Sequence, residues 1–252
     1  MEENVLKLMT FNLRVDTPVD GLNRFERRKA AIADYLQRQA ADVYGFQEVL
    51  PGMNNYLSSR MSDYQWIGLP RSDNEEACPI YYRKDRIVPI DSGTFWLSPT
   101  FDKKSVISGS HFIRIANYLV FSGLGTGKFA YFNTHLDYAS DQVSRTQLLL
   151  LLEQAKLIAK KQRAALIIGG DFNQRPGSST LEVLTKARLV SVYKEAIKPS
   201  VTYHGFGKIN TDAPIDHLFF HQKIVLGDCQ IDTQCYNGMW LSDHFPVIAT
   251  FK

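Results

Sequence analysis

Cysteine is scarce in this chain, and its distribution argues against two kinds of protein. The 252 residues include three cysteines, Cys78, Cys229 and Cys235. An odd and sparse set does not build a disulfide framework, and without a Cys-x-x-Cys pair a thiolate zinc site is not expected. We therefore expect three reduced thiols, most of them buried.

Long hydrophobic runs are also missing. An apolar run such as Leu148 to Leu152 is far too short to cross a bilayer. The opening residues, MEENVLKLMTFN, carry acidic side chains where a secretory signal peptide carries basic ones. We therefore expect a cytoplasmic protein that does not associate with membranes.

An excess of one charge is absent as well. The chain has 29 basic and 26 acidic residues and a net charge of +3, which does not predict a nucleic-acid surface, although a local patch is enough to bind a phosphate. The hydrophobic fraction of 44% and the charged fraction of 22% are ordinary for a globular protein. Because no repeat, low-complexity tract or linker interrupts the sequence, we expect one domain over residues 1–252.

Hydrophobic periodicity predicts a mixture of strands and helices. Helices are expected over residues 25–39, 141–162 and 179–187, and Ser140 or Asp141 is a suitable N-cap for the second. Strands are expected over residues 5–12, 42–48, 80–83, 111–121, 129–137, 164–170, 215–221 and 245–251. Two of the helices are long enough to cover a sheet, so the predicted fold class is an α/β sandwich with helices outside.

Polar side chains recur where these predicted strands begin or end. Four short segments close a strand and two open one, and neighbouring antiparallel strands would bring all six to one edge of the sandwich. The segments and their polar residues are Asn12 in TFNLR, Glu48 in FQEV, His135 in NTHLD, Asp171 and Asn173 in GGDFN, Asp216 in IDHLFF, and Asp243 and His244 in SDHFPV.

These residue types predict hydrolysis of a phosphate ester. Several carboxylates at one edge repel one another unless a cation lies between them. Carboxylate and amide oxygens suit Mg²⁺ or Mn²⁺ better than zinc, and such a cation polarises a phosphoryl oxygen. An Asp can position or deprotonate the attacking water, and a His with an Asp partner can protonate the leaving group or bind a phosphate oxygen.

The six segments, in the same order and over residues 10–247, resemble the endonuclease/exonuclease/phosphatase superfamily. Two further segments, GTFWLS at residues 93–98 and YYRKD at residues 81–85, resemble its uncharacterised bacterial members. Each segment is a weak signal alone, but six in order are specific. The resemblance implies a deoxyribonuclease I-like fold, a four-layer α/β sandwich of two packed, mostly antiparallel sheets flanked by helices. It also implies metal binding by Glu48 with Asn12, with Asp243 close enough to influence the metal.

The resemblance also implies roles for the other candidate residues. Asp171 resembles the residue that aligns or activates the attacking water, and Asn173 resembles a phosphate or transition-state contact. His135 would contact a non-bridging phosphate oxygen. Asp216 would orient His244.

Three arginines are candidates for binding the substrate phosphate. Arg14 stands where some abasic-site endonucleases carry Asp, which argues against that activity. Arg114 lies within an apolar predicted strand, where an unpaired charge is costly, so it either pairs with a buried acid or meets the phosphate. Arg145 opens the long helix and points either to the site or to solvent. His217 and His221 fall on the strand face opposite Asp216, and we expect structural roles for both.

The predicted function is a divalent-metal-dependent phosphodiesterase or phosphatase. A small phosphate ester is favoured over a long nucleic acid, because the charge is modest and the longest basic run, Arg27 to Lys29, lies on a predicted outer helix face. A nuclease is the alternative, and a non-catalytic phosphate-binding module is the alternative from another class. No obligate protein partner is predicted. Because one fold serves many substrates, selectivity is expected to lie in loops such as 70–78, 99–109 and 199–211.

Overall fold

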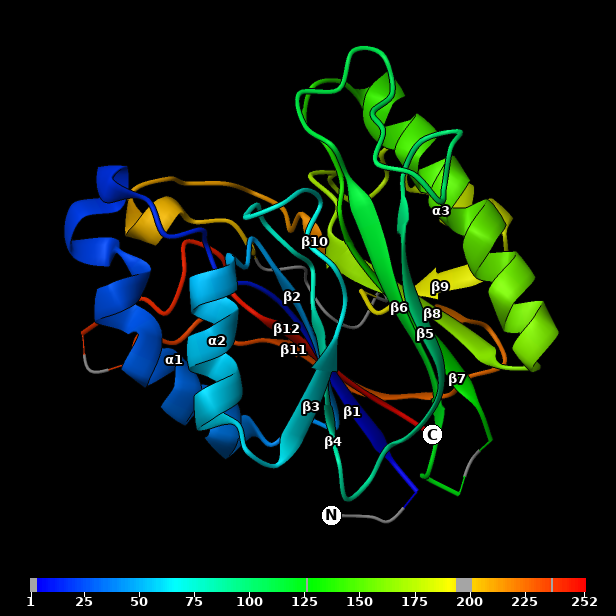
Figure 1. The fold of residues 1–252 in the computed structure, drawn as a ribbon, viewed down its shortest axis with the longest axis horizontal. Helices are drawn as coiled ribbons and strands as arrows, with labels where there is room; N and C mark the ends of the chain where they lie inside the picture. Colours follow the sequence, from blue (N-terminus) through cyan, green and yellow to red (C-terminus); the bar gives the residue numbers. More distant parts are fainter. Residues whose placement is uncertain (1–3, 126, 194–200, 237) are drawn as a thin grey trace.

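Two six-stranded sheets pack face to face, and helices cover the outer face of each (Figure 1). The computed structural model describes residues 4–125, 127–193, 201–236 and 238–252. The strand order is β11-β12-β1-β2-β4-β3 in the first sheet and β5-β6-β7-β8-β10-β9 in the second. The predicted four-layer α/β sandwich is confirmed.

The elements have the following bounds. The first sheet contains β1 (Leu6–Asn12), β2 (Val43–Gln47), β3 (Tyr64–Ile67), β4 (Ile80–Arg83), β11 (Leu226–Ile231) and β12 (Val247–Phe251). The second contains β5 (Val88–Trp96), β6 (Ile115–Ser122), β7 (Phe129–His135), β8 (Ala165–Asp171), β9 (Leu189–Ser191) and β10 (Asp216–His221). The helices are α1 (Phe25–Gln39), α2 (Pro51–Arg60), α3 (Asp141–Gln162) and α4 (Glu182–Lys186), with short 3-10 turns η1 (Pro18–Asn23) and η2 (Gly205–Gly207).

A parallel pair lies within each sheet and fixes which end of the sandwich carries the polar residues. β1 pairs in parallel with β2, and β7 pairs in parallel with β8, whereas the other eight pairings are antiparallel. In the second sheet, His135 is in register with Asp171, and Asp171 is in register with Asp216. Because parallel strands end at the same edge, the register alone places these three residues together.

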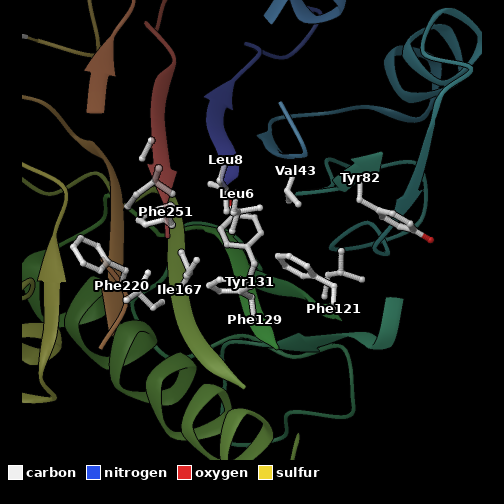
Figure 2. Packing of buried hydrophobic residues seen from close by; sticks show 14 of the residues in the cluster. Leu6, Leu8, Val43, Tyr82, Phe121, Phe129, Tyr131, Ile167, Phe220 and Phe251 are labelled. Atoms are coloured by element: carbon white, nitrogen blue, oxygen red, sulfur yellow. The ribbon is translucent and has the colours of Figure 1, made fainter. Parts of the chain in front are cut away.

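The space between the sheets is filled by alternating side chains of both. Leu6 and Leu8 of β1 point inward, toward Tyr131 of β7 and Ile167 of β8 (Figure 2). All four side chains are at most 1% exposed, and burial of each contributes roughly 1.5–3 kcal/mol to folding. The inward face that β1 presents therefore reads Leu6, Leu8, Thr10, Asn12, as the alternation predicted, and Asn12 ends it at the polar edge.

Each outer layer has a core of its own. α1 and α2 pack their apolar stripes against the outer face of the first sheet, and α3 does the same on the second (Figure 1). In α3, Leu148 and Leu151 are fully buried. The bounds predicted for α1 and α3 agree with the structure.

Other predicted bounds require correction. The strand expected over residues 111–121 begins only at Ile115, because the amide of Phe112 is bonded to Asp137 rather than to a neighbouring strand. The helix expected over residues 179–187 covers only Glu182–Lys186. Residues 199 and 200 of one predicted selectivity loop lie outside the described residues.

The cysteines agree with expectation. All three are free, Cys78 and Cys229 are buried, and Cys235 is exposed. Within the described ranges, no helix combines the length and the apolar character that crossing a membrane requires.

Candidate active site

The ends of four strands bring the predicted residues to one edge of the sandwich. Asn12 ends β1, Glu48 follows β2, and His135 and Asp171 end β7 and β8. Asp216 begins β10 directly beside Asp171. All except Glu48 are at most 7% exposed. The structure therefore places these predicted residues together.

Three residues at this edge have unusual backbone conformations. Gly170 has φ 138°, and a Cβ atom there would lie 1.9 Å from the carbonyl oxygen of Thr134, so β8 approaches β7 more closely than a side chain permits. Glu48 and Asn173 have φ of 60° and 51°, in the left-handed region that few side chains other than Asn adopt. Such conformations are typical of functional sites, because the surrounding structure has to hold them in place.

Asn12 links the two sheets at this edge. Its Nδ2 donates to Oε1 of Glu48 and to Oδ2 of Asp171, both at 3.0 Å. Its Oδ1 accepts from the backbone N–H of Arg14 at 2.9 Å. In this conformation Asn12 offers hydrogens to the two carboxylates, and its oxygen is engaged elsewhere.

Asp171 is a buried carboxylate that faces both histidines. Its Oδ1 accepts from the backbone N–H of Asn173 at 3.0 Å, and its Oδ2 lies 3.6 Å from Nε2 of His135 and 3.8 Å from Nε2 of His244. Burial, together with the nearby Asp216 carboxylate, raises the pKa of Asp171 to about 7. At neutral pH this carboxyl can therefore exchange a proton readily.

Asp216 and His244 form a buried ion pair. Nδ1 of His244 donates to Oδ2 of Asp216 at 2.8 Å. Although burial opposes the charged imidazole, the Asp216 carboxylate outweighs it and raises the pKa of His244 to about 10. The remaining oxygen of Asp216, Oδ1, is buried and has no partner among the described residues. His244 is therefore a cation at neutral pH and directs its Nε2–H toward Asp171.

His135 is held in the opposite charge state. Burial, and after it the charge of Arg114, lowers the pKa of His135 well below its usual range. Asn173 places its Nδ2 3.1 Å from Nε2 of His135 and 3.0 Å from the carbonyl oxygen of Leu136. Since the amide donates, Nε2 of the neutral ring accepts and the ring proton lies on Nδ1. The site thus contains one neutral and one charged histidine.

A second group of charges lies around Arg14. Its Nε is 2.9 Å from Asp20 and 3.7 Å from Asp243, and its Nη1 is 3.9 Å from Oε2 of Glu48. Burial raises the pKa of Asp243 above its ordinary value. Arg14 is thus bonded to Asp20 and offsets part of the negative charge of this acidic corner.

The donor chemistry of this corner fits a hard divalent cation. Glu48 and Asp243 offer carboxylate oxygens, and Oε2 of Glu48 accepts only from the backbone N–H of Val15 among the described donors. Asp171, Asp216 and His244 also offer atoms that lie within 4.8 Å of one another. In that second group, Nδ1 of His244 is already bonded to Asp216. Glu48 and Asp243 are therefore the better candidates.

Arg114 has no hydrogen bond to its Nε among the described residues. Its Nε is buried and unpaired within the described part of the chain, 3.7 Å from Oδ2 of Asp137, and its guanidinium packs on the ring of Phe112. It lines a small hollow of about 10 Å³ together with His135 and Arg71. Of the two alternatives for Arg114, the pairing with a buried acid is present as an ion pair with Asp137. Because no hydrogen bond to Nε accompanies it among the described residues, the guanidinium is also suited to meet an anion.

Arg71 was not predicted, and Arg145 lies apart from these groups. Arg71 lies in the loop after β3 and forms ion pairs with Glu75 and Glu76. Its neighbouring sequence contains no motif that would have identified it as a site residue. Arg145, in the first turns of α3, donates to the backbone carbonyl of Ser179. No described contact joins Arg145 to the carboxylates.

Arg28 corrects a prediction. The expected outer face of α1 included this residue, but its side chain is fully buried. It donates to the backbone carbonyls of Leu13, Arg14, Asn23 and Leu241. The physical reason lies in helical spacing: Phe25, Arg28 and Ile32 are three and four residues apart, so Arg28 shares the buried stripe. That spacing was the available signal.

His217 occupies the structural position expected of it. It is fully buried, and its Nε2 lies 2.7 Å from the carbonyl oxygen of Gln174, to which it donates. His221 is partly exposed at the end of β10, and its Nδ1 accepts from the backbone N–H of Lys223.

The comparisons with known proteins agree with this geometry. The model of the Endonuclease/Exonuclease/phosphatase family matches residues 9–244. The chain is similar to an endonuclease/exonuclease/phosphatase from Bacteroides vulgatus, with 29% identity, 98% of each chain covered and a TM-score of 0.89. It is also similar to a mannosyl-6-phosphatase from Bacteroides thetaiotaomicron, with 25% identity, 98% of this chain and 99% of that chain covered, and a TM-score of 0.90.

A more distant likeness shows the fold alone. D. rerio TDP2, in a complex with a single strand DNA product, is 20% identical over 98% of this chain and 99% of its own, with a TM-score of 0.78. No curated protein matches the sequence significantly.

Proposed function

Because the chain belongs to the endonuclease/exonuclease/phosphatase family, we propose that it hydrolyses phosphate ester bonds with the help of Mg²⁺ or Mn²⁺. One observation carries the proposal: a buried carboxylate, Asp171, lies between a neutral His135 and the charged His244. A phosphate-binding module has no need of a proton acceptor and a proton donor side by side. A catalyst of ester hydrolysis needs both.

Glu48 and Asp243 would hold the cation, with Asn12 beside them. When bound, the cation polarises a phosphoryl oxygen and neutralises charge on the departing oxygen. Asn12 reaches Glu48 through its amide nitrogen in this conformation, so its part is to fix the carboxylate unless its side chain turns over. Arg14, which lies near both carboxylates, would help to balance their negative charge.

Asp171 would take the proton of the attacking water. Asn12 and the backbone N–H of Asn173 each hold one of its oxygens at 3.0 Å, so the carboxylate cannot rotate freely. Because the base is already oriented, little conformational entropy is lost when it reaches the reactive geometry.

His244 would give its Nε2 proton to a phosphoryl or leaving oxygen, because Asp216 maintains its positive charge through Nδ1. Arg114 has donors free for the phosphate, and Asn173 and His135 adjoin the same space. Arg145 has no place in this arrangement, so we propose Arg14 and Arg114 alone as the arginines that meet the substrate or its cation.

For the substrate, we favour a small phosphate ester such as a sugar phosphate. The relative at 25% identity is a mannosyl-6-phosphatase, and the net charge of +3 is small for a protein that grips a long nucleic acid. The TDP2 likeness keeps a nuclease as the alternative, but at 20% identity it concerns the fold. No obligate protein partner is part of the proposal.

An activity screen tests the proposal. The wild-type protein is assayed with hexose phosphates, simple phosphodiesters, phospholipids and oligonucleotides, with Mg²⁺, Mn²⁺ or a chelator. We expect hydrolysis of a small ester that the chelator abolishes. Metal-independent hydrolysis would contradict the cation, and hydrolysis of no ester at all would favour a binding module.

A salt series separates a small ester from a nucleic acid. Binding of single-stranded and double-stranded oligonucleotides to the Asp171→Asn protein is measured across salt concentrations. A small-ester enzyme binds them weakly with a shallow slope. Tight binding with a slope that implies roughly five or more neutralised phosphates would instead establish a nuclease.

A further inference from the structure

A pocket of about 340 Å³ opens at the same edge of the first sheet, beside the proposed active site. Its walls come from the start of α2, the end of β3 and the loop between β3 and β4. The lining residues are Val49, Pro51, Asn54, Asn55, Trp66, Gly68, Pro70, Asp73, Asn74, Glu75 and Ala77. β3 runs parallel to β2, since both are antiparallel to β4, so Gly68 leaves β3 at the edge where Glu48 leaves β2.

Trp66 supplies an open aromatic face to this pocket. Its side chain is 42% exposed, although tryptophan is usually well buried. The indole stacks on the ring of Tyr81, its register partner on β4, with 6.4 Å between the centroids and 24° between the planes. The hydroxyl of Tyr81 in turn donates to Oδ1 of Asn54 at 2.7 Å. The indole is therefore fixed in orientation from beneath.

Asn54 supplies a free donor beside the indole. Asn54 is 8% exposed, and its Oδ1 accepts a hydrogen bond from the hydroxyl of Tyr81. Its Nδ2 has no partner among the described residues. This nitrogen is not one of the buried unpaired atoms, so it is accessible from the pocket. The pocket it lines is the place from which a ligand oxygen can reach it.

The remaining polar groups of the pocket restrict the ligand. Asp73 and Asn74 are exposed at the rim, and Glu75 is bonded to Arg71. No Lys, Arg or His lines the pocket, so it is unsuited to a phosphate. The carboxylates of the pocket can accept hydrogen bonds from ligand hydroxyl groups, and the Asn54 amide can donate to ligand oxygens. The Trp66 face can pack on an apolar surface of C–H groups. An uncharged sugar ring has hydroxyl groups, ring oxygens and a C–H face, so it matches all three.

We propose that the pocket around Trp66 binds an uncharged glycosyl ring of the substrate. The ring would lie on the indole, accept from Nδ2 of Asn54 and donate to Asp73. This inference rests on the proposed function, because it assigns a place to the part of the substrate that does not react.

The chain itself connects this pocket to the reacting groups. Val49, in its wall, directly follows Glu48 and pairs with Ala77 through two backbone hydrogen bonds of 3.2 and 2.8 Å. The loop that ends at Ala77 has two sides. Glu75 lines the pocket, whereas Glu76, together with Arg71, lines the small hollow of His135 and Arg114. A substrate with its phosphate at the reacting groups and a sugar ring on Trp66 would therefore straddle this loop.

Binding of an unphosphorylated sugar tests the inference without catalysis. Methyl α-mannoside and adenosine are titrated, at about millimolar concentration as weak one-ring ligands require, into the wild type, Trp66→Ala, Trp66→Phe and Asn54→Ala. Chemical shifts of the tryptophan indole N–H groups report the binding. We expect the mannoside to bind the wild type, Trp66→Phe to retain most of the affinity, and Trp66→Ala and Asn54→Ala each to lose about tenfold.

A wild type that does not bind the mannoside, or a Trp66→Ala protein that binds it unchanged, overturns the inference. Tighter binding of adenosine than of the mannoside overturns the sugar class. Trp66 is partly exposed, so its variants are expected to fold, and a circular dichroism melt of each variant confirms this.

Kinetics separate this inference from the proposed function. The ratio of kcat/KM for a disaccharide phosphate to that for glycerol phosphate, which has no ring, should fall about tenfold in Trp66→Ala, the loss expected for one aromatic contact. An unchanged ratio in an active protein contradicts the pocket alone. Absence of all hydrolysis together with intact mannoside binding contradicts the proposed function alone.

Discussion

Asn12 donates to Asp171 at 3.0 Å although the two residues belong to different sheets of the sandwich. Each is the last residue of its strand, and each is at most 1% exposed. The bond therefore links the two sheets at the edge where the reacting groups meet. The separation between the cation-binding corner and the proposed base is thus set by the packing of the whole core.

Glu48→Gln removes a negative charge and retains the shape of the side chain. We expect loss of activity and much weaker Mg²⁺ binding with an unchanged melting temperature, because a neutral amide is a poorer ligand for a hard cation. Calorimetric titration of Mg²⁺ measures the effect. Glu153→Gln, on the exposed side of α3, is the matched control and should behave as wild type. Unaltered Mg²⁺ affinity in Glu48→Gln would remove Glu48 from the metal site.

Asp171→Asn removes the proposed proton acceptor. We expect kcat to fall by at least about a hundredfold, the lower end of what loss of a general base costs, and KM to change less. Steady-state kinetics on the ester found in the activity screen provide the measurement. Asp63→Asn, at an exposed turn, serves as the control. A kcat near that of the wild type would assign the water to another residue.

Asp216 and His244 should behave as one unit. Without Asp216 the imidazole loses the partner that keeps it charged, so removal of either residue disables the same proton donor. The loss of kcat in the double alanine variant should therefore be little larger than that in His244→Ala. Losses that multiply fully would show that the two side chains act independently.

His217 should make folding stability sensitive to acid. Burial lowers the pKa of His217 to about 4, below the ordinary value of 6.5. Between these values the unfolded chain binds a proton that the folded chain does not, so stability is lost as the pH falls through this window. The slope contributed by one such group is about 1.4 kcal/mol per pH unit.

Urea unfolding at pH 7.5 and pH 5 measures this dependence. His217→Gln retains a donor for the carbonyl of Gln174 but cannot titrate, so the difference in the free energy of unfolding between the two pH values should shrink. His221→Gln, at a partly exposed position, should reduce it less. An equal pH dependence in wild type and His217→Gln would contradict the assignment.

The long elements could be predicted from the sequence because each buries one regular face. In α3, Ser140 caps the first turn by accepting from the backbone N–H of Val143 at 3.2 Å, and leucines follow at helical spacing. α2 could not be predicted, because its sequence PGMNNYLSSR buries only Met53, Asn54 and Leu57. Its position depends on tertiary contacts with α1 and β3, which the local sequence pattern does not reveal.

The candidate site divides in the same way. Residues that end or begin strands could be predicted, because register carries them to one edge. Arg71 could not, because its loop reaches the site only through tertiary folding. The sequence identified Arg114 as a candidate, but it could not decide between pairing with a buried acid and binding phosphate. That choice depends on which carboxylates lie near Arg114 in the folded chain. The left-handed backbone of Glu48 has no sequence signal, because Glu rarely adopts it.

The side chain of Arg28 connects backbone segments that flank the proposed active site. Its guanidinium donates to carbonyls after β1, within η1 and before β12, so it connects the N-terminal segment to a segment more than 200 residues later in the chain. Segments held in this way open together or remain closed together. In native-state hydrogen exchange, the amides around Arg14 and Leu241 are therefore expected to exchange with one common opening free energy, as a single cooperative unit at the rim of the catalytic edge.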